Sequence, residues 1–402
     1  MKKFTNWLLM IGFLTVLFAV PIVGAVQPDA IVTKTENRSL RQAPDMEHPT
    51  LSYLAPALRD YVVDQFPFRE ELLGIYSRLQ LAMGKNRVRG LYVTDDAWLM
   101  SQQYARVDWQ LPRYTDALTE LARTHPQTHF VYAMVPFKTG ALYRLAPDYI
   151  SNWVGEDNRA QTLQAMRGVN NLQLIDLVSY FEQAYTPEEL KNLYFPTDFH
   201  WNAAGALDAM EYIRAQLESS GTLDSASSAV TQDVALEWLP RTYDGDLNRQ
   251  LSYALPSETQ VPVCVLKNTQ DVRYYMSVDN SKQVPREKIV GAGKDKDIVT
   301  YSDLYTENLG YYRVVNPHAR VKQRVLLLKD SFQDPTTDYF TALFSEVEII
   351  DPRYYQEQAQ FEDFLREGKP DLVLFLYHQN NFSSELVRFI EGKPIHPKGE
   401  SS

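Results

Sequence analysis

The chain has 402 residues, of which 45% are hydrophobic and 12% aromatic, enough for one large α/β domain or two smaller ones. With 51 acidic and 40 basic residues its formal net charge is −11, which argues against binding nucleic acid through the phosphates. One cysteine excludes an intramolecular disulfide, and only seven histidines are present, so we expect neither a metal site nor another cofactor.

The amino terminus carries a membrane signal. Lys2 and Lys3 precede an uncharged apolar run over residues 7–26, long enough to cross a hydrocarbon core of ~30 Å. We interpret residues 1–26 as a retained anchor in the cytoplasmic membrane; a cleaved signal peptide, with Val23-Gly24-Ala25 before the cut, is the alternative. Both interpretations place the rest of the chain outside the cytoplasm.

Residues 27–50 are polar and predict a linker, followed by a domain over residues 51–390 and a flexible tail over 391–402. The domain opens with helical patterns over 54–62 and 72–83, and then a short hairpin over 91–100.

From residue 113 helical patterns alternate with continuous apolar runs, which is typical of parallel strands buried in an α/β domain. The rhythm is lost between 221 and 316, and we predict an insertion on the α/β core there. Thr186 and Asn202 are predicted helix caps. The expected core strands are 130–135, 172–177, 325–328, 347–350 and 372–376.

One polar stretch, Thr197 to Asn202, contains an Asp two residues before a His. Asp198 could hold the imidazole of His200 in one tautomer and support positive charge on it, as a general base requires. The alternative is a loop in which Asp198 only caps a turn.

A serine follows a predicted strand far downstream. Ser331 lies beyond the apolar run 325–328, where reacting groups of α/β sheets collect, and Asp334-Pro335 predicts the start of the next helix. In that turn, neighbouring backbone N–H groups could stabilise an oxyanion. We expect His200 to take the proton of Ser331, giving an acyl-serine; a serine in an ordinary connecting turn is the alternative. No Gly-x-Ser-x-Gly elbow surrounds Ser331, which argues against a lipase-type fold.

These two motifs resemble those of the DHHW family of exported proteins, relatives of the SGNH hydrolase-like domains of alginate O-acetyltransferases. The resemblance implies a three-layer α/β/α domain with a mostly parallel central sheet, in which the Asp-His motif precedes the Ser motif. Phe199 stands where the family has a second His, and Lys329 where SGNH enzymes have Gly. The motifs that carry the resemblance are Asp198-Phe199-His200-Trp201, Lys329-Asp330-Ser331-Phe332, Phe66-Pro67-Phe68-Arg69, Gly90-Leu91-Tyr92 with Trp98-Leu99, Val135-Pro136-x-Lys138, Tyr243-Asp244-Gly245-Asp246-Leu247 and Ile350-Asp351-Pro352-Arg353-Tyr354-Tyr355.

The resemblance further implies an extracytoplasmic O-acyltransferase that moves an acetyl group onto a cell-envelope polysaccharide. A second protein, a membrane-bound O-acyltransferase, would supply the acyl group across the membrane. SGNH enzymes take an oxyanion donor from an Asn, for which Asn380 or Asn381 is the candidate. Arg353 could contact an acyl or sugar oxygen, or could form a surface salt bridge. A carbohydrate esterase and a catalytically silent envelope-binding or scaffold protein are the alternative functions.

Overall fold

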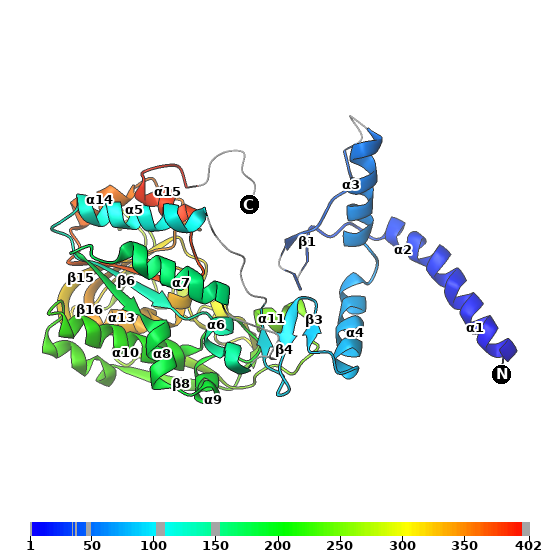
Figure 1. Ribbon diagram of the computed structural model, residues 1–402, viewed down its shortest axis with the longest axis horizontal. Helices are drawn as coiled ribbons and strands as arrows, with labels where there is room; N and C mark the ends of the chain where they lie inside the picture. The colour runs from blue at the N-terminus through cyan, green and yellow to red at the C-terminus, as the bar shows by residue number, and fades with distance from the viewer. Residues whose placement is uncertain are drawn as a thin grey trace. The chain divides into compact units, whose positions relative to one another are not determined.

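The computed structural model describes residues 2–33, 35–36, 38–45, 50–101, 109–145 and 153–395 (Figure 1). Contacts divide the chain into two compact units, one of residues 1–89 with 248–256 and one of residues 90–247 with 257–402. The extent of the domain, residues 51–390, stays a prediction, and the structure groups residues 51–89 with the smaller unit.

The smaller unit begins with a helix long and apolar enough to cross a membrane. Within it Leu9–Val26 has a mean hydropathy of 2.5 and no buried residue, properties that an anchor shares with a signal sequence. After it, the segment predicted as a linker packs on α3, because Arg38 forms an ion pair with Asp64 (2.7 Å). The helices and strands of this part are α1 (Lys2–Leu14), η1 (Thr15–Ala19), α2 (Val20–Val26), β1 (Val32–Thr33), β2 (Arg38–Ser39), α3 (Leu51–Asp64), α4 (Arg69–Ala82) and β3 (Arg87–Val88).

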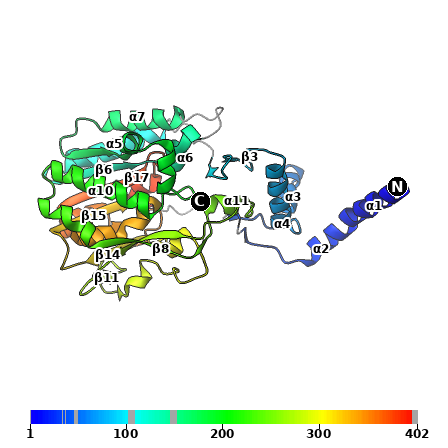
Figure 2. The same ribbon diagram turned by 90° about the horizontal axis from the view of Figure 1, so that it is seen from below.

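An eight-stranded sheet forms the centre of the larger unit, with strand order β12-β11-β14-β16-β15-β17-β6-β7. The five strands from β16 to β7 are parallel, and β14, β11 and β12 extend the sheet in antiparallel fashion. In Figure 2 the reader can trace this order through the labelled strands, from β6, near α7, to β11. The strands are β6 (Phe130–Val135), β7 (Leu172–Asp176), β11 (Arg273–Tyr275), β12 (Gln283–Val284), β14 (Tyr311–Val315), β15 (Val321–Lys329), β16 (Phe344–Ile350) and β17 (Leu372–His378).

Helices cover both faces of this sheet, so the predicted three-layer α/β/α architecture is confirmed (Figure 1). Alternate residues of β6 show why: Tyr132 joins the apolar core on one face, whereas Val131 and Ala133 join the core on the other. One face carries α5 (Gln110–Thr124), α7 (Trp153–Met166), α14 (Phe361–Asp363), η7 (Phe364–Gly368) and α15 (Ser384–Ile390), and the other α8 (Leu177–Ala184), α10 (Ala203–Ser219) and α13 (Thr337–Leu343).

The span predicted as an insertion contributes more than loops. Besides β11, β12 and β14 it forms an antiparallel pair, β8 with β10, which packs against α10 and α13. The predicted caps are confirmed, since Asn202 accepts from Ala204 N at the start of α10 and Thr186 forms a capping box with Glu189 at α9. The smaller elements are β4 (Leu91–Val93), β5 (Leu99–Met100), α6 (Lys138–Leu142), η2 (Tyr143–Leu145), α9 (Pro187–Leu190), η3 (Lys191–Leu193), η4 (Ser225–Gln232), β8 (Val234–Leu239), β9 (Thr242–Tyr243), α11 (Asp246–Gln250), β10 (Val261–Leu266), η5 (Arg286–Lys288), β13 (Ile298–Val299), α12 (Tyr301–Leu304) and η6 (Ser331–Thr336).

Candidate active site

Ser331 is the first residue of a short 3-10 helix, η6, that begins just beyond the carboxyl end of β15. Asp330 caps this helix, because its carboxylate accepts the N–H of Phe332 (3.0 Å). The prediction that Asp334-Pro335 starts the helix is therefore wrong: both residues lie inside η6. Asp334 instead forms a buried ion pair with Lys329.

The structure brings the three predicted residues together. Nε2 of His200 lies 2.8 Å from Oγ of Ser331, and Nδ1 of His200 lies 2.8 Å from Oδ1 of Asp198. Asp198 and His200 are buried, whereas Ser331 is partly exposed. An imidazole held this way, with Nδ1–H donating to the carboxylate, presents Nε2 as the acceptor for the serine proton.

The carboxylate of Asp198 has further hydrogen-bond donors. Its Oδ2 accepts the hydroxyl of Tyr243 and the backbone N–H of Asp246, each at 3.0 Å. Burial acts to raise the pKa of Asp198, but the neighbouring His200 imidazole and the N–H donors prevail and hold that pKa well below its usual range. Asp198 is therefore held as an anion, hydrogen-bonded to Nδ1 of His200.

Tyr243 and Asp246 belong to a segment that lies tightly against the Asp-His loop. Leu247 N donates to Thr197 O (3.1 Å), and a Cβ on Gly245 would lie 2.2 Å from Thr197 Oγ1. Only glycine fits such an approach. The sequence marked this segment as a family landmark, but its contact with Asp198 could not be read from it.

Tyr301 is another contact of the site that the sequence prediction missed. Its hydroxyl donates to the backbone oxygen of Ser331 (3.0 Å), and its ring stacks on the imidazole of His200. Phe199 also lies against that imidazole, with 4.0 Å between ring centroids. The imidazole thus contacts two aromatic rings, Tyr301 stacked at 13° and Phe199 tilted at 33°.

Asp330 also organises the end of β17. Its Oδ2 accepts the backbone N–H of His378 (2.9 Å) and the side-chain amide of Asn381 (3.0 Å). Asn381 is thus tied to the residue that precedes Ser331, while its amide has a second N–H that could face an oxyanion. Asn380 instead has its side-chain oxygen 3.5 Å from the amide of Asn158. Both stay predictions as oxyanion donors.

Arg353 and Lys329 meet at Asp351. The Arg353 guanidinium binds the Asp351 carboxylate through Nε (2.9 Å) and Nη2 (2.6 Å), and the Lys329 ammonium lies 3.5 Å from the same carboxylate. Arg353 is partly exposed and stays a predicted ligand contact. Lys329, which replaces a Gly of SGNH enzymes, is a buried member of this charge cluster.

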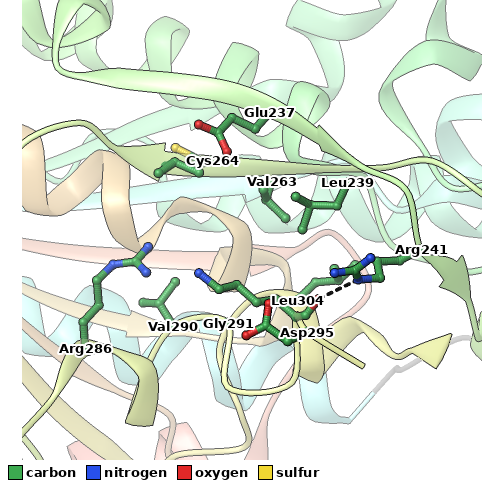
Figure 3. A pocket seen from close by; sticks show the side chains of 12 residues that line it. Glu237, Leu239, Arg241, Val263, Cys264, Arg286, Val290, Gly291, Asp295 and Leu304 are labelled. Carbon is green, nitrogen blue, oxygen red and sulfur yellow. Dashed lines mark hydrogen bonds between the residues drawn. The ribbon is translucent and has the colours of Figure 1, made fainter. Parts of the chain in front are cut away.

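The span 221–316 also encloses a cavity of about 220 Å³ (Figure 3). Arg286 and Arg241 lie toward opposite ends of it in this view, with Val263 and Leu239 along one wall. Leu304 of α12 also lines the cavity, and Tyr301 on the same helix stacks on His200. The cavity and the candidate active site thus share α12.

The arrangement suits nucleophilic catalysis by a serine. Among the residues that the structure describes, no group of three or more His, Cys, Asp or Glu side chains is placed to hold a metal ion. The groups placed together are the hydroxyl of Ser331, the imidazole of His200 in contact with it, and the carboxylate of Asp198 on the other side of the imidazole.

Comparisons with known proteins agree with this architecture. Residues 91–288 match the family described as SGNH hydrolase-like domain, acetyltransferase AlgX. This part of the chain is similar to SGNH hydrolase-like domains, and the predicted resemblance is confirmed. No curated protein matches the sequence.

Solved structures show the same fold. Bacillus cereus PatB1 is similar with a TM-score of 0.65 and 24% identity, over 74% of this chain and 99% of that chain. The structure of PatB1 with a sulfonyl adduct has a TM-score of 0.64 and 24% identity, over 74% of this chain and 97% of that chain. A DHHW family protein from Eubacterium siraeum has a TM-score of 0.57 and 16% identity, over 77% of this chain and 98% of that chain.

Proposed function

We propose that the chain is an extracytoplasmic O-acyltransferase that moves an acetyl group onto a cell-envelope polysaccharide through an acyl-serine on Ser331. The contact of Ser331 Oγ with His200 Nε2, at 2.8 Å, is the observation that carries the proposal. The match of residues 91–288 to an acetyltransferase family supports the acetyl group. The apolar helix over Leu9–Val26 supports a position at the membrane, as an anchor or as a signal sequence.

The chemistry needs two displacements. Ser331 Oγ attacks the carbonyl carbon of an acyl ester while His200 takes the serine proton, and the donor alcohol leaves with that proton. A sugar hydroxyl then attacks the acyl-serine, His200 takes its proton, and the proton returns to Ser331. Asp198 stabilises the imidazolium in both halves. A membrane-bound O-acyltransferase is the proposed source of the acyl group, on the family resemblance alone.

The test uses the full chain in detergent with p-nitrophenyl acetate as donor and a panel of neutral and acidic oligosaccharides as acceptors. Wild type is expected to release p-nitrophenol and to acetylate at least one oligosaccharide, detected by mass spectrometry. Ser331→Ala and His200→Ala should lose both. Release without transfer to any acceptor would favour the esterase, and equal turnover by Ser331→Ala would contradict the proposal and favour a silent scaffold.

A second measurement reports the nucleophile directly. PatB1 has been solved with a sulfonyl adduct, so phenylmethanesulfonyl fluoride is a suitable probe. A serine activated by His200 should form one sulfonyl ester at Ser331, located by peptide mass spectrometry. Labelling of His200→Ala at the wild-type rate would show that His200 does not activate the serine.

A further inference from the structure

Lys138 is a fully buried lysine that the proposed reaction does not use. It is the first residue of α6, three positions beyond the end of β6. Its ammonium donates to three backbone oxygens of the Asp-His loop, those of Phe195 (2.6 Å), Pro196 (2.8 Å) and Asp198 (2.7 Å). It also lies over the ring of Trp98, 4.9 Å from the centroid.

The geometry matches the chemistry of a charged lysine. An ammonium has three N–H donors and no acceptor, and here three oxygens receive them. Burying such a charge is costly unless it is hydrogen-bonded, so Lys138 depends on the three carbonyls, of which that of Pro196 also accepts the backbone N–H of Leu99 (3.0 Å). The carboxylates that act electrostatically on it are Asp198 and Glu258, but its hydrogen bonds go to the loop backbone.

The Asp-His loop lies outside the strands of the central sheet. Residues 194–201 connect η3 to α10 and contribute only an isolated bridge, Tyr194 with Trp201, so no strand of the central sheet fixes their backbone. Ser331 follows β15, whereas Lys138 follows β6, and β17 lies between these two strands. Tyr194 OH also donates to Pro136 O (2.9 Å), so the β6 end holds the loop at a second point.

We infer that Lys138 is a positioning residue whose ammonium fixes the backbone of residues 195–198, so that Asp198 holds His200 within hydrogen-bonding distance of Ser331. The inference rests on the proposed function, because it assigns Lys138 a role in activating the same serine. It differs from a role in stability alone, since the loop that Lys138 binds carries both Asp198 and His200.

Asn171 provides a matched control. Its side-chain amide also donates to three backbone oxygens, those of Ala122 (2.9 Å), His125 (2.9 Å) and Thr128 (3.0 Å). It precedes β7 and lies at the amino ends of β6 and β7, the opposite edge of the sheet from Ser331. Asn171→Ala therefore removes a comparable bridge without touching the Asp-His loop.

The experiment compares full-length wild type, Lys138→Met, Lys138→Gln and Asn171→Ala in detergent. The rate of Ser331 sulfonylation by phenylmethanesulfonyl fluoride should fall on the order of 10²-fold in Lys138→Met, because displacement of a catalytic pair by about 1 Å has that effect. Lys138→Gln, which restores two N–H donors, should be intermediate, and Asn171→Ala should match wild type. A wild-type rate in a folded Lys138→Met, or in Lys138→Gln if Lys138→Met does not fold, would overturn the inference.

A spectroscopic measurement separates this inference from the proposed function. A His Nδ1–H held by a carboxylate gives a far-downfield ¹H NMR signal, which reports the Asp198–His200 contact whether or not any acyl group is transferred. The signal should be present in wild type and Asn171→Ala and lost or shifted in Lys138→Met. If it is unchanged in Lys138→Met, Lys138 does not position the pair; if it responds as expected while wild type shows no acyl transfer, only the proposed function fails.

Discussion

The phenol ring of Tyr301 lies flat on the imidazole of His200, with ring centroids 3.8 Å apart and ring planes 13° apart. The same side chain donates its hydroxyl to the backbone oxygen of Ser331 (3.0 Å). Tyr301 therefore contacts both members of a pair that is 131 positions apart in the chain. An aromatic face also attracts a cation, so the stack would favour the imidazolium that the proposed reaction forms on His200.

Two substitutions at Tyr301 should separate its ring from its hydroxyl. Tyr301→Phe keeps the stack and loses one hydrogen bond, for which we expect a fall in kcat/KM of roughly fivefold, since a typical bond is worth about 1 kcal/mol. Tyr301→Leu also loses the stack and should fall further, by a second factor of about 3–30. Steady-state kinetics with p-nitrophenyl acetate measures both. Equal activities of the two variants would show that the ring has no role beyond filling space.

Asp198→Asn should reduce kcat on the order of 10³–10⁴-fold with little change in KM. An amide is neutral, and its NH₂ group can donate to Nδ1, which would place the imidazole in the wrong tautomer. Tyr243 and Asp246 can still donate to the remaining carbonyl oxygen, so the fold should be preserved. Single-turnover kinetics checks the effect, with circular dichroism as the control for folding. A loss below tenfold would contradict the orienting role of Asp198.

The strands and the two motifs could be predicted because their signals are local. β6 and β17 lie where their apolar runs placed them, and Asn202 caps α10 as its position before the helix indicated. Ser331 could be placed at a strand end for the same reason, since strand ends follow from local pattern. The start of η6 was misplaced because Asp330 and Asp334 are both chemically suitable caps, and only the burial of Lys329 shows that Asp334 is committed elsewhere.

Other contacts join residues that are far apart in the chain, and these could not be predicted from the sequence. Tyr301 reaches His200 from α12, and Lys138 reaches the Asp-His loop from α6. Neither residue has a local pattern that names its partner. Phe199, unexplained in the sequence, has a place once the structure shows its ring against His200 and stacked on Phe137, with 5.9 Å between the Phe centroids.

Gly245→Ala should lower activity without altering residues of the triad. The new Cβ would lie 2.2 Å from Oγ1 and 2.5 Å from the backbone oxygen of Thr197, so the segment carrying Tyr243 and Asp246 must move away from Asp198. We expect kcat to fall at least about tenfold, because Asp198 then loses hydrogen bonds to its charged form, each worth roughly 1.5–3 kcal/mol.

Gly368→Ala is the matched control for this substitution. A Cβ there would have its nearest contact at 3.5 Å, with Glu348 Oε2, which is an ordinary van der Waals distance. Kinetics and thermal unfolding of both variants are compared. Activity in Gly245→Ala equal to that of Gly368→Ala would show that the close approach to Thr197 does not support Asp198.

Above neutral pH, we expect activity to fall while the contribution of Lys138 to the free energy of unfolding rises. Burial lowers the pKa of Lys138 to about 7, while the carboxylates that act on it electrostatically, Asp198 and Glu258, act to raise it. In the unfolded chain a lysine has its usual pKa of about 10.4. Between these values the unfolded chain binds the additional proton, so the contribution of Lys138 to the free energy of unfolding increases with pH. The neutral amine, however, has two N–H donors for three carbonyls.

Activity is therefore expected to decline as pH rises through about 7, while this group does not destabilise the fold. Rates of Ser331 sulfonylation and urea unfolding curves, both from pH 6 to pH 9, measure the two quantities on the same protein. Lys138→Met should lack the alkaline decline in rate, whereas Asn171→Ala should retain it. A decline that persists unchanged in Lys138→Met would assign the alkaline loss to another group and leave Lys138 without a role in it.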